Sequence, residues 1–271
     1  SVYKSKSLEY IFIASSSTIS DEHWFIPSDN VFAEWKVIQK REDDLEYAVE
    51  HYQNDFYIIT NEGDATNFKI MKTSVDKPSK EHWKEVIPHK KETLLEGFEI
   101  FKDYFVIEER TEGLLQLKII ENSTGKSHYL PFDEPTYTAY VGLNLDFDTE
   151  VLRYGYTSLT TPSSTYEYNM KTGETKLLKQ QEVLGGTFDA KNYISERIWA
   201  NSRDGKVKIP ISLVYHKDTP KSAETPLLLY GYGSYGHTID ASFSNVRLSI
   251  LDRGFIYAIA HVRGGEYLGR E

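Results

Sequence analysis

Tyr10-Ile11-Phe12-Ile13 is an apolar run that returns three more times along the chain at a nearly constant interval. The equivalent runs are Phe56-Tyr57-Ile58-Ile59, Tyr104-Phe105-Val106-Ile107 and Val151-Leu152-Arg153-Tyr154. Their second residues lie 46, 48 and 47 positions apart. A repeat with a period in the forties is typical of proteins built from copies of one supersecondary unit.

Further strand-like segments follow these runs. A second set covers residues 67–72, 115–120 and 164–169, and a third covers residues 34–39, 82–88, 126–132 and 174–180. Turn residues such as Lys171-Thr172-Gly173 separate the segments, as hairpins require. Several short strands in a unit of this length predict propeller blades. A β-sandwich also has closely spaced strands, but it gives no reason for so constant a repeat.

Residues 1–184 contain four of these units, so we expect a partial β-propeller of four blades. Many closed propellers have more blades than this. The composition agrees with a β-rich domain, because the 20 Tyr, 13 Phe and 4 Trp residues suit pleated, half-buried strands.

The repeat is lost after Gln181, and residues 185–271 predict a second, truncated domain. Residues 193–200 and 206–216 flank a turn-forming Asp204-Gly205 pair and predict a hairpin. The continuous apolar run Pro226-Leu227-Leu228-Leu229-Tyr230 is typical of a strand that is buried on both faces.

The pattern after this strand is that of an α/β sheet. Residues 243–252 predict a helix and residues 255–261 predict another buried strand. Ligands of open α/β sheets bind beyond the carboxyl ends of the strands. These ends fall at residues 231–236 and 263–265, which are both rich in glycine.

Charge and composition argue against several classes of function. The chain has a net charge of −10, which argues against the basic surface that nucleic-acid binding requires. No nucleic-acid partner is therefore expected. The chain has no cysteine, which excludes disulfides and favours a reducing, cytoplasmic location. The sequence contains no run of 18 apolar residues, so it predicts no membrane-spanning helix. The eight histidines lack metal-ligand spacing, and we expect neither a metal nor another cofactor.

Gly231-Tyr232-Gly233-Ser234-Tyr235-Gly236 resembles a catalytic loop but cannot supply a nucleophile. A nucleophile elbow has the pattern Gly-x-Ser-x-Gly, which occurs nowhere in the chain. Tyr232 has two interpretations. Its hydroxyl can donate a hydrogen bond to a developing oxyanion, or it can be a packed aromatic residue whose hydroxyl binds a carbonyl. The spacing alone favours the packed aromatic.

The chain resembles the oligopeptidase B (protease II) branch of the prolyl oligopeptidase family of serine peptidases. The motifs that carry this resemblance are Leu229-Tyr230-Gly231-Tyr232-Gly233-Ser234-Tyr235-Gly236, Ser249-Ile250-Leu251-Asp252-Arg253-Gly254-Phe255 and His261-Val262-Arg263-Gly264-Gly265. The resemblance implies a seven-bladed propeller joined to an α/β-hydrolase domain that cleaves short peptides. The chain is then expected to be a fragment that contains about four of the blades and the N-terminal part of the hydrolase domain.

The resemblance also implies roles for individual residues. Tyr232 matches an oxyanion-hole tyrosine, and Tyr235 matches a position that lines the substrate side-chain pocket. Asp240 matches the first of two acids that bind basic substrate side chains, whereas Ser242 stands at the second position, which weakens that preference. The Ser-His-Asp triad is expected to lie outside the chain.

The implied parent cleaves short basic peptides after Lys or Arg, and the fragment alone is expected to be inactive. Its open sheet edges are expected to cause non-native self-association. The alternative function is a non-catalytic β-propeller interaction module, for which the C-terminal strands serve only as a cap.

Overall fold

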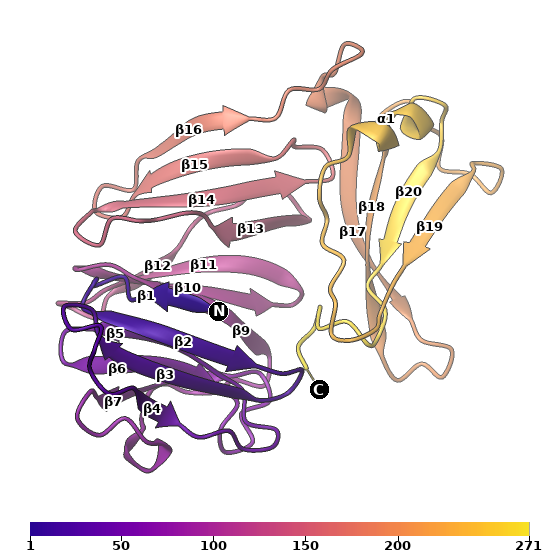
Figure 1. Cartoon of the computed structure of the whole chain (residues 1–271). Coiled ribbons are helices and arrows are strands. Elements are labelled where there is room, and N and C mark those ends of the chain that lie inside the picture. Colours follow the sequence, from indigo (N-terminus) through magenta and orange to yellow (C-terminus); the bar gives the residue numbers. More distant parts are fainter. Residues whose placement is uncertain (271) are drawn as a thin grey trace.

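A computed structural model describes residues 1–270; Glu271, the last residue of the second predicted domain, lies outside the described residues. Five four-stranded sheets make up this part of the chain, and Figure 1 shows four of them stacked beside one another with the fifth at one side. The first two sheets are formed by β1 (Val2–Lys4), β2 (Tyr10–Ser16), β3 (Asp21–Pro27), β4 (Lys36–Gln39), β5 (Tyr47–Tyr52), β6 (Asp55–Thr60), β7 (Lys69–Ser74) and β8 (Lys84–Ile87). The next two are formed by β9 (Thr93–Ile100), β10 (Tyr104–Thr111), β11 (Leu114–Glu121), β12 (Ser127–Tyr129), β13 (Tyr137–Val141), β14 (Val151–Ser158), β15 (Ser164–Asn169) and β16 (Thr175–Gln180).

Each of the first four sheets is an antiparallel meander in chain order, as propeller blades are. The four blades predicted from the repeat are confirmed, and the repeated runs form the second strand of each blade. The first strand of every blade was missed. A turn of two residues connects it to the second strand in the second blade and a turn of three in the third, but the connection has five residues in the first blade and nine in the fourth. In the second blade, Tyr52 pairs with Asp55 across the turn.

The hydrophobic core lies between neighbouring blades. Phe12 and Phe25 of the first blade pack with Phe56 and Ile58 of the second. Similar clusters join the second blade to the third and the third to the fourth. The four blades therefore stabilise one another through the faces of their sheets, which explains why the strands alternate between buried and exposed residues.

A buried ion cluster also links the first three blades. The Lys6 side chain, which follows β1, forms an ion pair with Glu99 of β9. One carboxylate oxygen of Glu50 on β5 accepts hydrogen bonds from the backbone N–H groups of Lys6 (3.1 Å) and His51 (2.7 Å). Burial raises the pKa of Glu50 to about 7 despite these hydrogen bonds.

The free energy of unfolding should depend on pH through the protonation of the Glu50 carboxyl. A group with a raised folded-state pKa contributes stability below its unfolded pKa, and that contribution is lost as the pH rises through about 7. Glu50 should therefore lower the free energy of unfolding by up to about 1.4 kcal/mol per pH unit across this window. Urea unfolding should show that Glu50→Gln gains stability relative to wild type between about pH 5 and about pH 8. An equal difference at both pH values, or the same gain in the exposed control Glu224→Gln, would contradict this assignment.

The fifth sheet combines antiparallel and parallel pairing. Its strands are β17 (Tyr193–Asn201), β18 (Lys208–His216), β19 (Leu227–Gly231) and β20 (Ile256–Ala260), in the order β17-β18-β20-β19. A short helix, α1 (Asn245–Leu251), connects the parallel strands β19 and β20. Two 3₁₀ turns, Lys80–His82 and Ala190–Asn192, complete the regular elements.

The prediction that the strand after Pro226 is buried on both faces is wrong for the described chain. Leu227, Leu228 and Leu229 are each about half exposed. In Figure 1, β19 lies at the outer edge of the sheet, where β20 is its only neighbouring strand. The apolar run is thus an edge strand here, because α1 is the only α-helix among residues 1–270 and it packs mainly on β18 and β20.

Candidate functional site

Two glycine-rich loops meet beyond the carboxyl ends of β19 and β20. A Cβ atom on Gly233 would lie 2.3 Å from the carbonyl oxygen of Arg263. A Cβ atom on Gly264, whose φ is +97°, would lie 2.1 Å from the carbonyl oxygen of Gly233. The absence of a side chain at these glycines thus allows the second backbone to approach closely. The two loops cross closely at one corner, and Tyr232 lies on the first of them.

A prediction follows for this corner. Gly264→Ala introduces both backbone strain and a clash with a carbonyl, whereas Gly254→Ala introduces strain alone, because no atom lies within 4 Å of its Cβ position. We expect Gly264→Ala to lower the free energy of unfolding by about 2 kcal/mol more than Gly254→Ala does. Denaturant unfolding of both variants measures the difference. Equal losses would show that the loops do not cross as described.

Tyr232 is partly exposed, and its hydroxyl has no hydrogen-bond partner within residues 1–270. The side chain is 41% exposed. Its ring meets the ring of His237 edge to face, at a centroid distance of 5.9 Å and an interplanar angle of 77°. This contact orients the phenol without using its hydroxyl. Among residues 1–270, no carbonyl accepts a hydrogen bond from the Tyr232 hydroxyl, as the packed-aromatic interpretation would require.

Tyr235 and Asp240 lie on the same loop but in different surroundings. Tyr235 is 98% exposed and has a φ of +57°, which is unusual for a bulky side chain. Asp240 reaches the propeller. Its two oxygens accept hydrogen bonds from Nη1 (2.7 Å) and Nη2 (3.2 Å) of Arg110, at the end of β10. The structure thus places all three predicted residues on one loop, but no hydrogen bond or ring contact among residues 1–270 joins their side chains to one another.

Arg110 is the most heavily engaged cation at this interface. Its side chain is 3% exposed, and its Nε donates to Glu96 of β9 at 2.5 Å. Nη1 also donates to the carbonyl oxygen of Gly113 at 3.1 Å. Burial opposes the charge on Arg110, but the hydrogen bonds and charges of Asp240 and Glu96 outweigh burial and raise the pKa of the guanidinium. The group therefore remains a buried cation at every physiological pH.

Tyr267 and His261 fill the space behind the loop. Their rings stack at 3.5 Å, and Tyr267 also packs against the β10–β11 turn at Gly113. His261 Nε2 lies 2.8 Å from Ser212 Oγ, which in turn lies 2.7 Å from Thr136 Oγ1 of the fourth blade's N-terminal flank. Burial, with the nearby charges of Arg197 and Arg110, lowers the pKa of His261 to about 3. His261 is consequently a neutral structural group.

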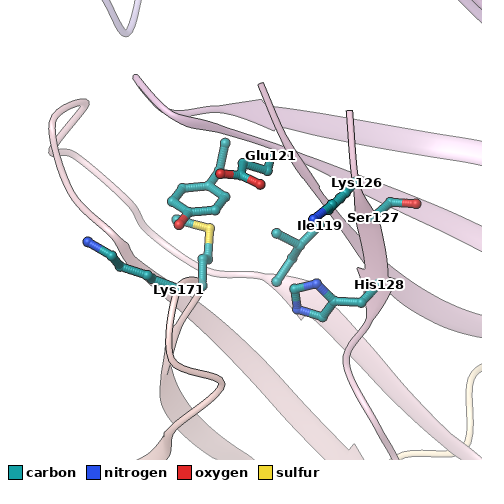
Figure 2. A pocket seen from close by; sticks show the side chains of 8 residues that line it. Ile119, Glu121, Lys126, Ser127, His128 and Lys171 are labelled. Carbon is teal, nitrogen blue, oxygen red and sulfur yellow. The ribbon is translucent and has the colours of Figure 1, made fainter. Parts of the chain in front are cut away.

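A separate pocket lies between the third and fourth blades. Figure 2 shows Glu121, His128 and Lys171 around it, and its volume is about 240 Å³. Its polar groups are engaged locally: His128 Nε2 lies 2.8 Å from the Tyr168 hydroxyl, and Lys171 forms an ion pair with Glu150 at 2.8 Å. We therefore interpret this pocket as a crevice between blades rather than a reaction site.

Comparison with known protein families identifies the domain that contains the four blades. The family described as "Prolyl oligopeptidase, N-terminal beta-propeller domain" matches residues 1–181. The chain belongs to the prolyl oligopeptidase family. Membership of this family agrees with the resemblance in the loop motifs and with the four blades, of which the last strand ends at Gln180.

Relatives in the prolyl oligopeptidase family match almost the entire chain. Dipeptidyl aminopeptidase BI of Pseudoxanthomonas mexicana is 44% identical over 269 residues, which cover 98% of this chain and 36% of that protein. Protease 2 of Moraxella lacunata is 35% identical over 99% of this chain and 38% of its own length. The chain thus spans little more than a third of the length of these relatives.

Solved structures of the family agree in fold. Oligopeptidase B from Leishmania major superimposes with a TM-score of 0.91 at 32% identity, over 100% of this chain and 39% of that one. Oligopeptidase B from Trypanosoma brucei, with covalently bound antipain in a closed form, gives a TM-score of 0.92 at 34% identity over the same shares. Both alignments include the fifth sheet as well as the blades.

Among residues 1–270, no group of three His, Cys, Asp or Glu side chains is arranged to hold a metal ion. Over the same residues, no helix is long and apolar enough to cross a membrane.

Proposed function

We propose that this chain is part of a serine oligopeptidase that hydrolyses short peptides after Lys or Arg, with its Ser-His-Asp triad outside the chain. In this proposal residues 1–184 form part of the propeller and residues 185–271 begin an α/β-hydrolase domain. The parallel β19-α1-β20 unit supports the second assignment, because such units build α/β sheets. The lack of cysteine supports a cytoplasmic location.

The observation that carries the proposal is Tyr232, a partly exposed residue directly after β19 whose hydroxyl has no hydrogen-bond partner among residues 1–270. In acyl transfer, the serine attacks the peptide carbonyl while the histidine accepts its proton, and the carbonyl oxygen becomes an oxyanion. Tyr232 Oη would donate a hydrogen bond to this oxygen, together with a backbone N–H from outside the chain. The ring contact with His237 keeps the donor oriented before the substrate binds.

Selection of Lys or Arg is the narrower part of the proposal. It rests on the resemblance to oligopeptidase B, which is the name of two solved structures that superimpose on this chain. The relative of 44% identity is named a dipeptidyl aminopeptidase. Asp240 is proposed to contribute a carboxylate to the subsite of a basic side chain. Arg110 contacts both Asp240 and Glu96, so the three groups together carry one positive and two negative charges. The remaining negative charge favours a cationic substrate. Tyr235 is proposed to cover that side chain.

The complete protein provides the test. Its rates on short peptide amides ending in Arg, Lys or Ala should differ, with Arg and Lys preferred, and a serine-directed phosphonate should abolish all of them. A folded protein should resist cleavage. Absence of hydrolysis would contradict the peptidase proposal and leave a propeller interaction module. Hydrolysis without a preference for Arg and Lys would contradict only the specificity.

We further propose that the 271-residue chain self-associates through β19, which presents an apolar edge. Size-exclusion chromatography should show concentration-dependent species larger than a monomer. Leu229→Lys should shift the distribution toward the monomer, because a charge on an exposed edge opposes pairing. Leu184→Lys, at an exposed position outside any strand, is the matched control. A monomer at all concentrations would contradict this proposal.

A further inference from the structure

The loop between Tyr232 and helix α1 has little structure of its own. Residues 237–244 contain no helix and no strand. A segment without its own backbone ladder depends on contacts with other elements to hold one conformation. Tyr232 lies between β19 and this segment, and its ring contacts His237, the first residue of the segment. The orientation of Tyr232 therefore depends on what holds residues 237–244.

The propeller supplies three of these contacts. Ala241 is buried in a cluster that includes Leu159, which follows β14. The Phe243 N–H donates to Thr157 Oγ1 of β14 at 3.1 Å. Asp240 binds Arg110 through both carboxylate oxygens. The third and fourth blades thus hold the loop from one side, and only the Arg110 contact is ionic.

We propose that Arg110 is a positioning residue, which holds residues 237–244 through Asp240 and thereby sets the location of the Tyr232 hydroxyl. The planar guanidinium suits this role because its donors reach Asp240, Glu96 and the Gly113 carbonyl at the same time. A lysine ammonium is a point charge without this fork and cannot reproduce the bidentate contact. The inference rests on the proposed function for its kinetic consequence but not for its structural one.

The structural consequence is measured by amide hydrogen exchange in the complete protein. We expect Arg110→Met to accelerate exchange at Ser242 and Phe243 by about tenfold or more, since loss of the ion pair leaves Asp240 without its partner. Arg110→Lys should give an intermediate rate and also serves if the Met variant fails to fold. Arg153→Met, which removes an exposed ion pair with Glu167 on the fourth blade, should leave these amides unchanged. Unchanged exchange in the Arg110 variants would overturn the inference, whatever happens to activity.

Kinetic measurements distinguish a positioning role of Arg110 from a general contribution to protein stability. We expect Arg110→Met to lower kcat by about tenfold to a hundredfold on a short uncharged peptide amide, with KM little changed, because a small displacement of a catalytic donor is costly. Asp240→Asn should lower kcat similarly, and the double variant should be no worse than either single variant. Additive losses would overturn the inference, as would faster exchange with an unchanged kcat.

The outcomes also distinguish this inference from the proposed function. If the complete protein hydrolyses no peptide, the proposed function fails, while the exchange measurement still decides whether Arg110 holds the loop. If Asp240 does not bind substrate, Asp240→Asn should affect charged and uncharged peptides equally. That result would remove the subsite but retain the positioning role.

Discussion

Tyr232→Phe is expected to lower kcat of the complete peptidase by about a hundredfold to a thousandfold, which is the usual effect of removing one oxyanion donor. KM should change little, because the hydroxyl is proposed to bind the transition state more strongly than the substrate. The ring and its contact with His237 are retained in the variant, so the loss would belong to the hydroxyl alone. Steady-state hydrolysis of an Arg-amide peptide measures the effect.

Tyr230→Phe provides the matched control for this prediction. Tyr230 is 43% exposed, close to the 41% of Tyr232, and lies two residues earlier at the end of β19. We expect its kcat to remain within about twofold of wild type, as for a surface substitution without a catalytic contact. An unchanged kcat in Tyr232→Phe would remove the oxyanion role.

Phe56→Ala is expected to have the largest effect on stability. Phe56 is fully buried between the first two blades, and its ring meets those of Phe12, Phe25 and Tyr10 edge to face at centroid distances of 5.7, 4.8 and 5.6 Å. Its loss leaves a cavity that the surrounding rings cannot fill. We expect the free energy of unfolding to fall by about 3–5 kcal/mol. Urea unfolding followed by tryptophan fluorescence measures the change.

Two further variants control for the Phe56 result. Phe56→Leu keeps most of the volume and should cost roughly half as much or less. Phe32→Ala removes a ring that is 95% exposed and should change stability by less than about 0.5 kcal/mol. If Phe56→Ala cost no more than Phe32→Ala, the interface between the first two blades would not be the packed core described here.

The repeat made the propeller predictable because each blade contains one strongly apolar strand. The first strands of the blades were missed although β5 carries a signal: Tyr47, Val49 and His51 alternate with exposed or partly exposed residues and are buried. A polar His at a buried position obscured that alternation. The fifth sheet was predicted in its element types and order, but the burial of β19 was not, since burial depends on which elements cover the sheet.

The sequence indicated the loop that carries Tyr232, Tyr235 and Asp240, but it gave no sign of their partners. Arg110 lies 130 residues before Asp240, and its sequence context does not distinguish it from any other charged residue at the end of a strand. Tyr267 and His261 also lacked a motif that would link them to the third blade. Such pairings arise only when the fold brings a blade against the fifth sheet, and local patterns contain no information about that contact.

Leu159 belongs to the propeller by sequence but to the fifth sheet by packing, since it shares a core with Val214, Ile259 and Leu251. The family boundary at residue 181 therefore does not divide the molecule into two independent modules. An exchange of propellers between relatives would have to transfer Leu159 together with compatible partners on β18, β20 and α1. Recombination at that boundary is thus restricted to pairs of proteins whose domains already fit each other.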